Sequence, residues 1–430
     1  MEKREIYKDN FAEYLLCLAL DVGEGMLRSG AEVSRVEDTI ERICHAYGAV
    51  HVEVFSIISF INATVRMPDG TYSSQMRRIR STGNNLAMLE AYNALSRKIC
   101  ALCPSLDEVD AELRQIKKTK VYSTPQMSFA SGLATGGFAL FFGGSWKDGI
   151  VAFIIGVIMK LVEIKMPSRV NAMAKTVISS AIAVGLAILT ANFNISDSAD
   201  YVIIGAIMVL VPGVTFGTAM RDLLYGDLLA GTLKTLQAIL LALMIAFGYI
   251  LSSELLSVFD ISIVPTVMVS DFETFFKPIF FIASIGAVLG SFAFAILFNV
   301  APRHLLYGTL CGLLTYAVYY TVEFFTGGMA FPAAFVSTMC TALFAEIASR
   351  TRKAPTIVFV IPGVIPTVPG GALYRAMRSL LLLDFEEALA ALLVTLQIGL
   401  GIAGGILAVS IVFGTVMEKI KKGKLKRNDQ

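Results

Sequence analysis

The chain has 430 residues, of which 55% are hydrophobic and 16% are charged, and its mean hydropathy is +0.68. This composition lies outside the range of ordinary soluble domains and predicts an integral membrane protein. The net charge of only +2 gives no global electrostatic reason to expect a nucleic-acid partner.

The charged side chains are concentrated toward the N-terminus. Residues 1–124 carry 16 Lys or Arg and 17 Asp or Glu side chains, which is 33 of the 70 in the chain. The first apolar run, "LLCLAL", is too short for a signal peptide, and Glu13, Asp21 and Glu24 interrupt any longer one. We therefore expect residues 1–122 to form a cytoplasmic domain and the remaining residues to lie mostly in the membrane.

Residues 1–122 are predicted to fold as a small α+β domain. In the second helix, Val33, Val36 and Ile40 recur at helical spacing and should face a core. The sequence Pro68-Asp69-Gly70 predicts a turn between two strands. The expected elements are helices at 10–28, from about Glu32, at 84–102 and at 105–120, and strands at 51–59, 61–67 and 71–81.

The six cysteines are scattered and predict no disulfide framework. Cys100 and Cys103 have the spacing of metal ligands, and Cys44 with His45 could complete a zinc set. Buried cytosolic thiols are the favoured interpretation, because the chain has no second Cys-x-x-Cys pair. We therefore predict no metal and no cofactor. The chain also lacks the pattern GxxxxGK[ST], which argues against an ATP-driven pump.

The rest of the chain predicts an α-helical membrane protein with ten transmembrane helices. The apolar segments are at 126–143, 148–164, 173–193, 199–216, 228–251, 276–298, 303–322, 329–347, 355–375 and 386–415. With both termini in the cytoplasm, nine Lys and Arg fall in the loops expected inside and four in the alternate loops. The alternate loops carry acidic residues, among them Asp197 and Asp200.

The expected division of the chain follows from this count. It comprises a cytoplasmic domain at 1–122, a first five-helix half at 123–255, an extracytoplasmic linker at 256–272, a second five-helix half at 273–418 and a basic cytoplasmic tail at 419–430.

The two halves contain copies of one sequence pattern, at 211–237 and 361–397. Each copy begins with Pro-Gly-Val and ends with Thr-Leu-Gln, and each contains Met-Arg-x-Leu-Leu-x-x-Asp, at 220–227 and at 377–384. Because five spans is an odd number, the second copy should enter the membrane from the opposite side, which predicts an inverted repeat of five plus five. The alternative is a pair of amphipathic hairpins with no transport role.

The Pro-Gly pairs of the repeat fall at membrane depth. The helix from Ala199 to Val211 is about 20 Å long and that from Pro355 to Ile361 about 10 Å, both short of the roughly 30 Å hydrocarbon core. Proline removes a backbone donor, and such broken backbone is tolerated only where it is buried in protein or lines a water-filled cavity. We therefore predict a cavity between the halves, with the longer second break as its gate.

Residues in and after the breaks are the predicted substrate-binding residues. Freed carbonyls and helix N-termini would suit a small zwitterion such as an amino acid, and the N–H donors alone would suit a carboxylic acid. Arg221 and Arg378 could clamp a carboxylate or mark the membrane surface. Gln237 and Gln397 could bind substrate or form hydrogen bonds between helices. The predicted set is Pro212, Gly213, Arg221, Asp227, Gln237, Pro362, Gly363, Pro366, Pro369, Gly370, Gly371, Arg378, Asp384 and Gln397.

Two acidic residues near apolar spans are the predicted proton-coupling candidates. Glu163 and Glu346 each lie close to the end of a span, where a carboxyl group could carry a coupling proton. The alternative is that both lie at the headgroup boundary and stay solvated.

The segment "SGAEVSRVEDTIERICHAYG", residues 29–48, resembles the threonine/serine exporter family. "STGNNLAMLEAYNALSR", "VLVPGVTFGTAMRDLLYGD" and "VIPGVIPTVPGG" fit the same resemblance, which covers nearly the whole chain. It implies a soluble N-terminal domain, ten transmembrane helices and export of threonine and serine driven by the proton motive force. Split relatives are associated with export of dicarboxylates such as succinate. The matching positions of the N-terminal motif are Gly30, Ala31, Glu32, Arg35, Val36, Glu37 and Asp38.

The charged residues of this motif lie off the apolar stripe of their helix, which fits a solvated face, docking onto the membrane part, or regulation.

The sequence thus predicts a proton-coupled secondary exporter of small hydrophilic amino acids. A dicarboxylate exporter is the alternative within transport, and a membrane-anchored enzyme or sensor that acts through residues 1–122 is the alternative of another class. The expected partners are the amino acid or carboxylic acid, protons and the lipid membrane, and a homo-oligomer stays open.

Overall fold

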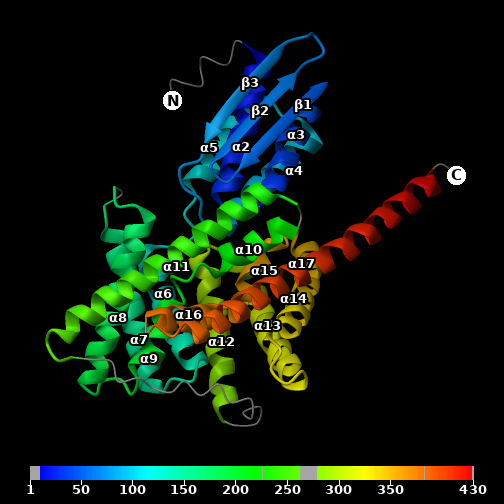
Figure 1. Cartoon of the computed structure of the whole chain (residues 1–430). Helices are drawn as coiled ribbons and strands as arrows, with labels where there is room; N and C mark the ends of the chain where they lie inside the picture. The colour runs from blue at the N-terminus through cyan, green and yellow to red at the C-terminus, as the bar shows by residue number, and fades with distance from the viewer. Residues whose placement is uncertain (1–9, 168, 225, 262–277, 382, 429–430) are drawn as a thin grey trace. The chain divides into compact units, whose positions relative to one another are not determined.

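The computed structural model describes residues 10–167, 169–224, 226–261, 278–381 and 383–428. The chain is mostly helical and divides into two compact units (Figure 1). The first unit comprises Met1–Tyr122, Asp227–Leu233 and Phe298–Pro302, and the second comprises Ser123–Gly226, Lys234–Leu297 and Arg303–Gln430. Most of the predicted linker at 256–272 lies outside the described residues.

The first unit contains a three-stranded antiparallel sheet in the order of the sequence, which confirms the three predicted strands. The strands are β1 (His51–Ile57), β2 (Phe60–Arg66) and β3 (Tyr72–Arg78). In the central strand β2, Ile61, Ala63 and Val65 are buried, at every second position. This period of two places one face of the sheet against a helical layer.

Four helices complete the domain: α2 (Phe11–Arg28), α3 (Val33–Ala46), α4 (Leu86–Leu102) and α5 (Leu106–Lys118). Helix α2 packs against β2 and β3 and also against α4 and α5. It is therefore buried almost all round, unlike an amphipathic surface helix, which buries a single face. Its buried Asp21 is paired with Lys117 of α5 at 3.3 Å and with Arg77 of β3 at 3.7 Å.

The helices that follow the N-terminal domain occur in the same order in both halves of the chain. In the first half the helices are α6 (Thr124–Phe141), α7 (Trp146–Lys165), α8 (Ala172–Asn192), α9 (Ala199–Ile207), α10 (Gly213–Leu224) and α11 (Leu228–Ser257). In the second half they are α12 (Pro278–Leu297), α13 (Leu305–Phe325), α14 (Ala330–Arg352), α15 (Ile357–Val364), α16 (Gly370–Leu381) and α17 (Phe385–Asn428). Each half thus has three helices, a pair of short helices around a break, and a final long helix.

Among the described residues, five helices are long and apolar enough to cross a membrane. They lie at Ala172–Asn192, Leu228–Ser257, Pro302–Phe325, Ala330–Arg352 and Phe385–Phe413, and the pair α15–α16, bent by 47°, makes a sixth if it counts as one span. The other predicted spans are shorter or less apolar helices. The chain is therefore a multi-pass membrane protein by length and composition, and ten crossings stay a prediction.

Small residues allow the helices of the second unit to pack closely. Gly137 of α6 faces Gly286 of α12, where an added Cβ would lie 2.5 Å from the Gly137 carbonyl oxygen. Hydroxyl groups add bonds between helices: Thr135 Oγ1 donates to the Ala152 carbonyl at 2.7 Å, and Ser180 Oγ donates to the Ile245 carbonyl at 2.7 Å. Such small and hydroxyl residues are typical of helix association in membranes, where burial of apolar surface gives little drive.

The last helix is longer than its sequence predicted. The final apolar segment was expected to end near residue 415, but α17 continues to Asn428, through most of the basic tail. Lysine and arginine are good helix formers, and positive charge at a helix C-terminus interacts favourably with the helix dipole.

Candidate functional site

The two breaks of the repeat differ in position. Helix α9 ends at Ile207 and α10 begins at Gly213, so Pro212 lies in the first break. The prediction that the second helix stops at Ile361 is wrong, because α15 continues through Pro362 and Gly363. A short 3₁₀ helix, Ile365–Thr367, follows, and α16 begins only at Gly370.

Packing explains why the helix passes its proline. Gly363 lies so close to α13 and α14 that a Cβ there would sit 2.5 Å from the Cβ of Cys311 and 2.9 Å from Cγ2 of Thr341. The neighbouring helices hold α15 in place although Pro362 has no N–H to donate. Proline is tolerated in membrane helices where neighbours provide such support.

The two breaks lie against each other. A Cβ on Gly213 of the first half would collide with the Val368 side chain of the second half, and a Cβ on Gly370 would collide with the Met208 sulfur. Gly371 faces Phe142, with 2.9 Å between an added Cβ and Cε1 of the ring. Glycine is needed at these positions because backbone and side chains of opposite halves approach there. The buried Pro366 lies in the 3₁₀ helix between α15 and α16.

A cavity of about 740 Å³ adjoins the breaks, among α10, α11, α16 and α17. Three predicted residues line it: Pro212, Gly213 and Pro369. Its other lining side chains are almost all apolar, in contrast to the predicted water-filled cavity. Thr235 and Thr395, the threonines of the repeated Thr-Leu-Gln triplet, provide its hydroxyl groups.

The glutamines of the triplet lie elsewhere. Gln237 is half-buried and Gln397 is exposed, and neither lines the cavity. Both copies of the triplet therefore contribute their threonine to the cavity, and the second copy also contributes Leu396, but neither contributes the glutamine that the sequence singled out.

Buried hydroxyl groups surround the Pro362–Gly363 segment. Thr315 of α13 and Thr341 of α14 are hydrogen-bonded to each other and have no exposed surface. Ser291 of α12 is equally buried and lies against Gly312. The sequence analysis missed these residues, although a hydroxyl group inside an apolar span is a signal that could have found them.

The first repeated arginine, Arg221, is buried in an ionic cluster. Its neighbour Asp222 pairs with Lys234 of α11 at 2.5 Å, and Nη2 of Arg221 lies 4.0 Å from Asp222 Oδ1. Arg221 and Asp222 are 7% and 5% exposed. Arg221, Asp222 and Lys234 therefore form one largely buried ionic cluster within the first half.

The second repeated arginine, Arg378, faces the other half of the repeat. Its Nη2 lies 3.9 Å from Asp200 Oδ2 of α9, and the Tyr374 hydroxyl donates to Asp200 Oδ1 at 3.3 Å. Asp200 has no exposed surface, although the sequence analysis placed it among the loop charges. The reason is that α9 begins at Ala199, so Asp200 enters the membrane part in the first helical turn, where a carboxylate interacts favourably with the helix dipole.

The repeated aspartates cap helices. Asp227 Oδ1 accepts from the Ala230 N–H at 3.2 Å, at the start of α11, and Asp384 Oδ1 accepts from the Glu387 N–H at 3.1 Å, at the start of α17. An aspartate at this position satisfies a backbone donor that the helix leaves unpaired. The structure places neither residue on the cavity.

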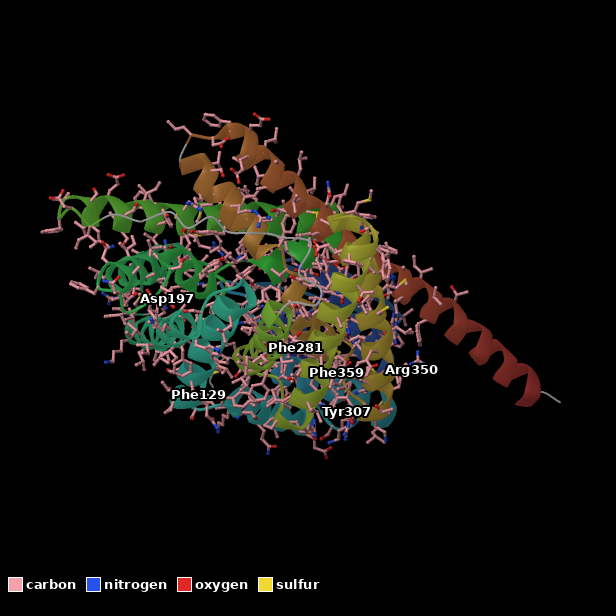
Figure 2. The ribbon with its side chains drawn as sticks, turned by 90° about the horizontal axis from the view of Figure 1, so that it is seen from below. Phe129, Asp197, Phe281, Tyr307, Arg350 and Phe359 are labelled. Atoms are coloured by element: carbon pink, nitrogen blue, oxygen red, sulfur yellow. The ribbon has the colours of Figure 1, made fainter. Side chains whose placement is uncertain are left out.

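The two predicted coupling residues lie near helix ends. Glu163 is 46% exposed and pairs with Lys160 at 2.9 Å. Glu346 is 22% exposed, accepts from the Thr356 hydroxyl at 3.0 Å and lies 3.8 Å from Arg350. Figure 2 labels Arg350 together with Tyr307 and Phe359, whose rings are 6.1 Å apart on α13 and α15.

The N-terminal motif builds one end of the first unit. Gly30 has a φ of +97°, a backbone conformation that favours glycine, and an added Cβ would lie 2.9 Å from Asn84 Oδ1. The loop around it is bonded to the segment before α4, since the Gly83 N–H donates to the Arg28 carbonyl and the Asn85 N–H to the Ser29 carbonyl. This pairing fixes where α4 starts.

The N-terminus of α4 in turn holds a segment that follows α12. The Leu86 N–H donates to the Phe298 carbonyl at 2.9 Å and the Ala87 N–H to the Asn299 carbonyl at 3.0 Å. Asn85 accepts from the Met88 N–H at 3.2 Å. Three backbone donors of the first helical turn therefore have acceptors, two of them in Phe298–Pro302, within the same compact unit.

The charged residues of the motif have separate roles. Glu37 ties α3 to β1, because its Oε1 accepts from the Ser56 N–H at 2.6 Å and from the Ser56 hydroxyl at 3.1 Å. Burial raises the pKa of Glu37 above its ordinary value, against the opposing effect of the Ser56 bonds. Arg35 bonds Asn93 of α4 at 3.4 Å, and Asp38 pairs with Arg42 on the same exposed helix face. Glu32 occupies the N-cap position of α3.

The cysteines considered as zinc ligands differ in exposure. Cys44 is buried, as the interpretation of buried thiols expected, whereas that interpretation is wrong for Cys100 and Cys103, which are exposed. Within the described part of the chain, no group of three His, Cys, Asp or Glu side chains is arranged to hold a metal ion.

Comparisons with known proteins agree on one family. A threonine/serine exporter family model matches residues 17–256, and a second threonine/serine exporter model, ThrE, matches residues 283–412. A threonine/serine exporter of Corynebacterium glutamicum is 22% identical over 90% of this chain and 81% of its own length. The "Probable threonine/serine exporter" of Mycobacterium tuberculosis is 24% identical over 91% of this chain and 75% of its own length.

A fungal protein is also similar. The pheromone-regulated membrane protein 10 of Debaryomyces hansenii is 23% identical over 85% of this chain and 36% of its own length. No solved structure matches the chain.

Proposed function

Because the chain belongs to the threonine/serine exporter family, we propose that it is a secondary exporter of threonine and serine, driven by the proton motive force. In this proposal the substrate crosses between two inverted five-helix halves that open alternately to the two sides. The observation that carries the proposal is the contact of the two broken segments, with Gly213 against Val368 and Gly370 against Met208. Broken helices that meet at the interface of internal repeats are the usual location of substrate sites in secondary transporters.

The first unit supports the proposed topology. Residues 227–233 and 298–302 belong to the same compact unit as the N-terminal domain, which supports a topology with all three on one side of the membrane. An even number of crossings must therefore separate Tyr122 from Asp227, and likewise Leu233 from Phe298. Four crossings by α6, α7, α8 and the α9–α10 pair, and two by α11 and α12, satisfy both conditions. The four remaining predicted crossings bring the total to ten and return the C-terminus to the side of the N-terminus.

The apolar cavity fits a closed state of such a transporter. A zwitterion needs hydrogen-bonding partners for both charged groups, and the cavity offers chiefly the hydroxyls of Thr235 and Thr395. The hydroxyls around Gly363 lie close to the second break, and Arg221 lies in the helix that follows the first break. A movement of the broken segments would bring these polar groups to the substrate.

Counterflow in proteoliposomes tests the proposal. Vesicles loaded with unlabelled threonine or serine should take up the labelled amino acid, and an imposed pH gradient should drive accumulation. Labelled succinate serves as the competing substrate, and uptake of succinate alone would replace the amino-acid proposal by a dicarboxylate exporter. Absence of uptake of all three compounds would refute the exporter.

A further inference from the structure

The cluster of Asp200, Tyr374 and Arg378 joins the two halves of the repeat. Asp200 belongs to α9 of the first half, whereas Tyr374 and Arg378 belong to α16 of the second half. The carboxylate accepts a hydrogen bond from the Tyr374 hydroxyl at 3.3 Å and lies 3.9 Å from the Arg378 guanidinium. Tyr249 of α11 adds a third helix, with its ring 6.5 Å from that of Tyr374.

Burial of the Asp200 carboxylate costs free energy, which points to a functional reason for its position. A fully buried carboxylate loses its hydration, and in a membrane protein such a group faces the bundle interior and marks a substrate or proton pathway by default. Its guanidinium partner comes from 178 residues later in the sequence. If the carboxylate were neutralised, Arg378 would lose that partner and α9 and α16 would lose their ionic contact.

The two repeated arginines differ in whether their ion pairs cross between the halves. Arg221, Asp222 and Lys234 all belong to the first half, so their pairing does not hold the halves together. Met220 and Met377, which precede the two arginines, both line the cavity. Each ionic cluster thus contains a neighbour of a cavity-lining methionine, and the cluster that contains Asp200 is the one that joins the halves.

We propose that Asp200 and Arg378 form a proton-operated latch on the extracytoplasmic side of the cavity. This inference rests on the proposed exporter and its topology, in which the loop before α9 faces outward. A proton that enters from outside neutralises Asp200, the contact between α9 and α16 is lost, and the halves separate on that side. After the halves have closed outside and opened inside, release of the proton to the cytoplasm restores the carboxylate and re-forms the latch.

Several other polar groups face Asp200 from neighbouring helices. They are Tyr374 and Arg378 on α16 and Tyr249 on α11, while Tyr201 on α9 itself interacts electrostatically with both Asp200 and the buried Asp148 at the start of α7. Asp148 has a structural role, since it accepts from the backbone N–H groups of Asp197 and Ser198 at 2.8 and 3.0 Å. The tyrosines are neutral at physiological pH, so the contact that the proposal uses is the one between the Asp200 carboxyl and the Arg378 guanidinium.

The test separates driven transport from exchange. In proteoliposomes, Asp200→Asn should retain counterflow of labelled threonine, which needs no net proton movement, and should lose the additional accumulation that a pH gradient produces. Asp200→Glu keeps an ionisable group and should retain the driven component with a shifted pH profile. The matched control is Asp197→Asn. Asp197 lies in the loop that leads into α9, is labelled in Figure 2, and its side chain is 48% exposed and paired with Lys147. This variant should behave like the wild type.

The outcomes are distinguishable from failure of the proposed function. If the wild type shows no threonine or succinate counterflow, the exporter itself is refuted. If the wild type exchanges and accumulates substrate but Asp200→Asn accumulates it equally under a pH gradient, the latch is refuted. Should Asp200→Asn fail to reach the membrane, Arg378→Gln removes the other partner, and unchanged driven accumulation by that variant would equally refute the latch.

Discussion

Removal of charge from the cluster of Arg221, Asp222 and Lys234 should destabilise the membrane part by an amount that depends on which charge is removed. Breaking a buried pair by removing one partner costs about 3–5 kcal/mol, because the other charge stays buried. Lys234 is 15% exposed, so some water reaches its ammonium group, and we expect about 3 kcal/mol for Asp222→Asn. Lys234→Met should cost less, about 2 kcal/mol, since Arg221 remains 4.0 Å from Asp222.

The double variant decides whether the two groups act as a pair. If they do, Asp222→Asn with Lys234→Met should cost about 3 kcal/mol, well below the sum of about 5 kcal/mol for independent sites. Trp146 on α7 is the one tryptophan of the chain, so its fluorescence during denaturant unfolding reports on the second unit. A destabilisation of about 3 kcal/mol is roughly a hundredfold change in the unfolding equilibrium. Additive losses, or a fully stable Asp222→Asn, would refute the reasoning.

Three further predictions concern the repeat and the N-terminal domain. Gly213→Ala should reduce threonine counterflow by pushing against Val368, and Val368→Ala in the same chain should restore part of it; equal activity of Gly213→Ala and the wild type would contradict the close contact. Asp227→Asn and Asp384→Asn should keep both helix caps and near wild-type counterflow, whereas loss of counterflow in well-folded protein would favour the predicted substrate role. The raised pKa of Glu37 means that the folded state binds the proton of this carboxyl group more tightly than the unfolded state does, so the contribution of Glu37 to stability falls as the pH rises above about 4.5. Thermal unfolding of full-length Glu37→Gln, measured against pH, should lack this loss of stability. Parallel pH profiles of the variant and the wild type would argue against the assignment.

Local patterns predicted the elements well because their causes are local. Alternation of buried positions such as Ile61, Ala63 and Val65 is a property of one strand, and the helical stripe of Val33, Val36 and Ile40 is a property of one helix. The order of helices in the two halves followed in the same way from apolar length and from the repeated motif.

The candidate site was only partly predictable because its causes are distant in the sequence. The sequence places Asp200 among the loop charges, since no residue near it in the sequence indicates that Arg378 and Tyr374 lie beside it. Pro362 was expected to end its helix, but the close packing of Gly363 on Cys311 of α13 keeps that helix continuous. The repeat correctly indicated that both segments contain a break, but it did not indicate which residues of the repeated Thr-Leu-Gln triplet face the cavity.

The hydrogen bonds at the start of α4 bear on how a truncated chain should be interpreted. A protein that begins after Tyr122 would leave the carbonyls of Phe298 and Asn299 without the Leu86 and Ala87 donors, and the Val300 carbonyl without the Tyr122 hydroxyl that bonds it at 2.7 Å. Three lost bonds at about 1 kcal/mol each are enough to alter the end of a membrane helix. Inactivity of such a truncated protein could therefore result from the loss of these hydrogen bonds as well as from the loss of a sensory function of residues 1–122. Supplying residues 1–122 as a separate polypeptide would restore these hydrogen bonds without the covalent link.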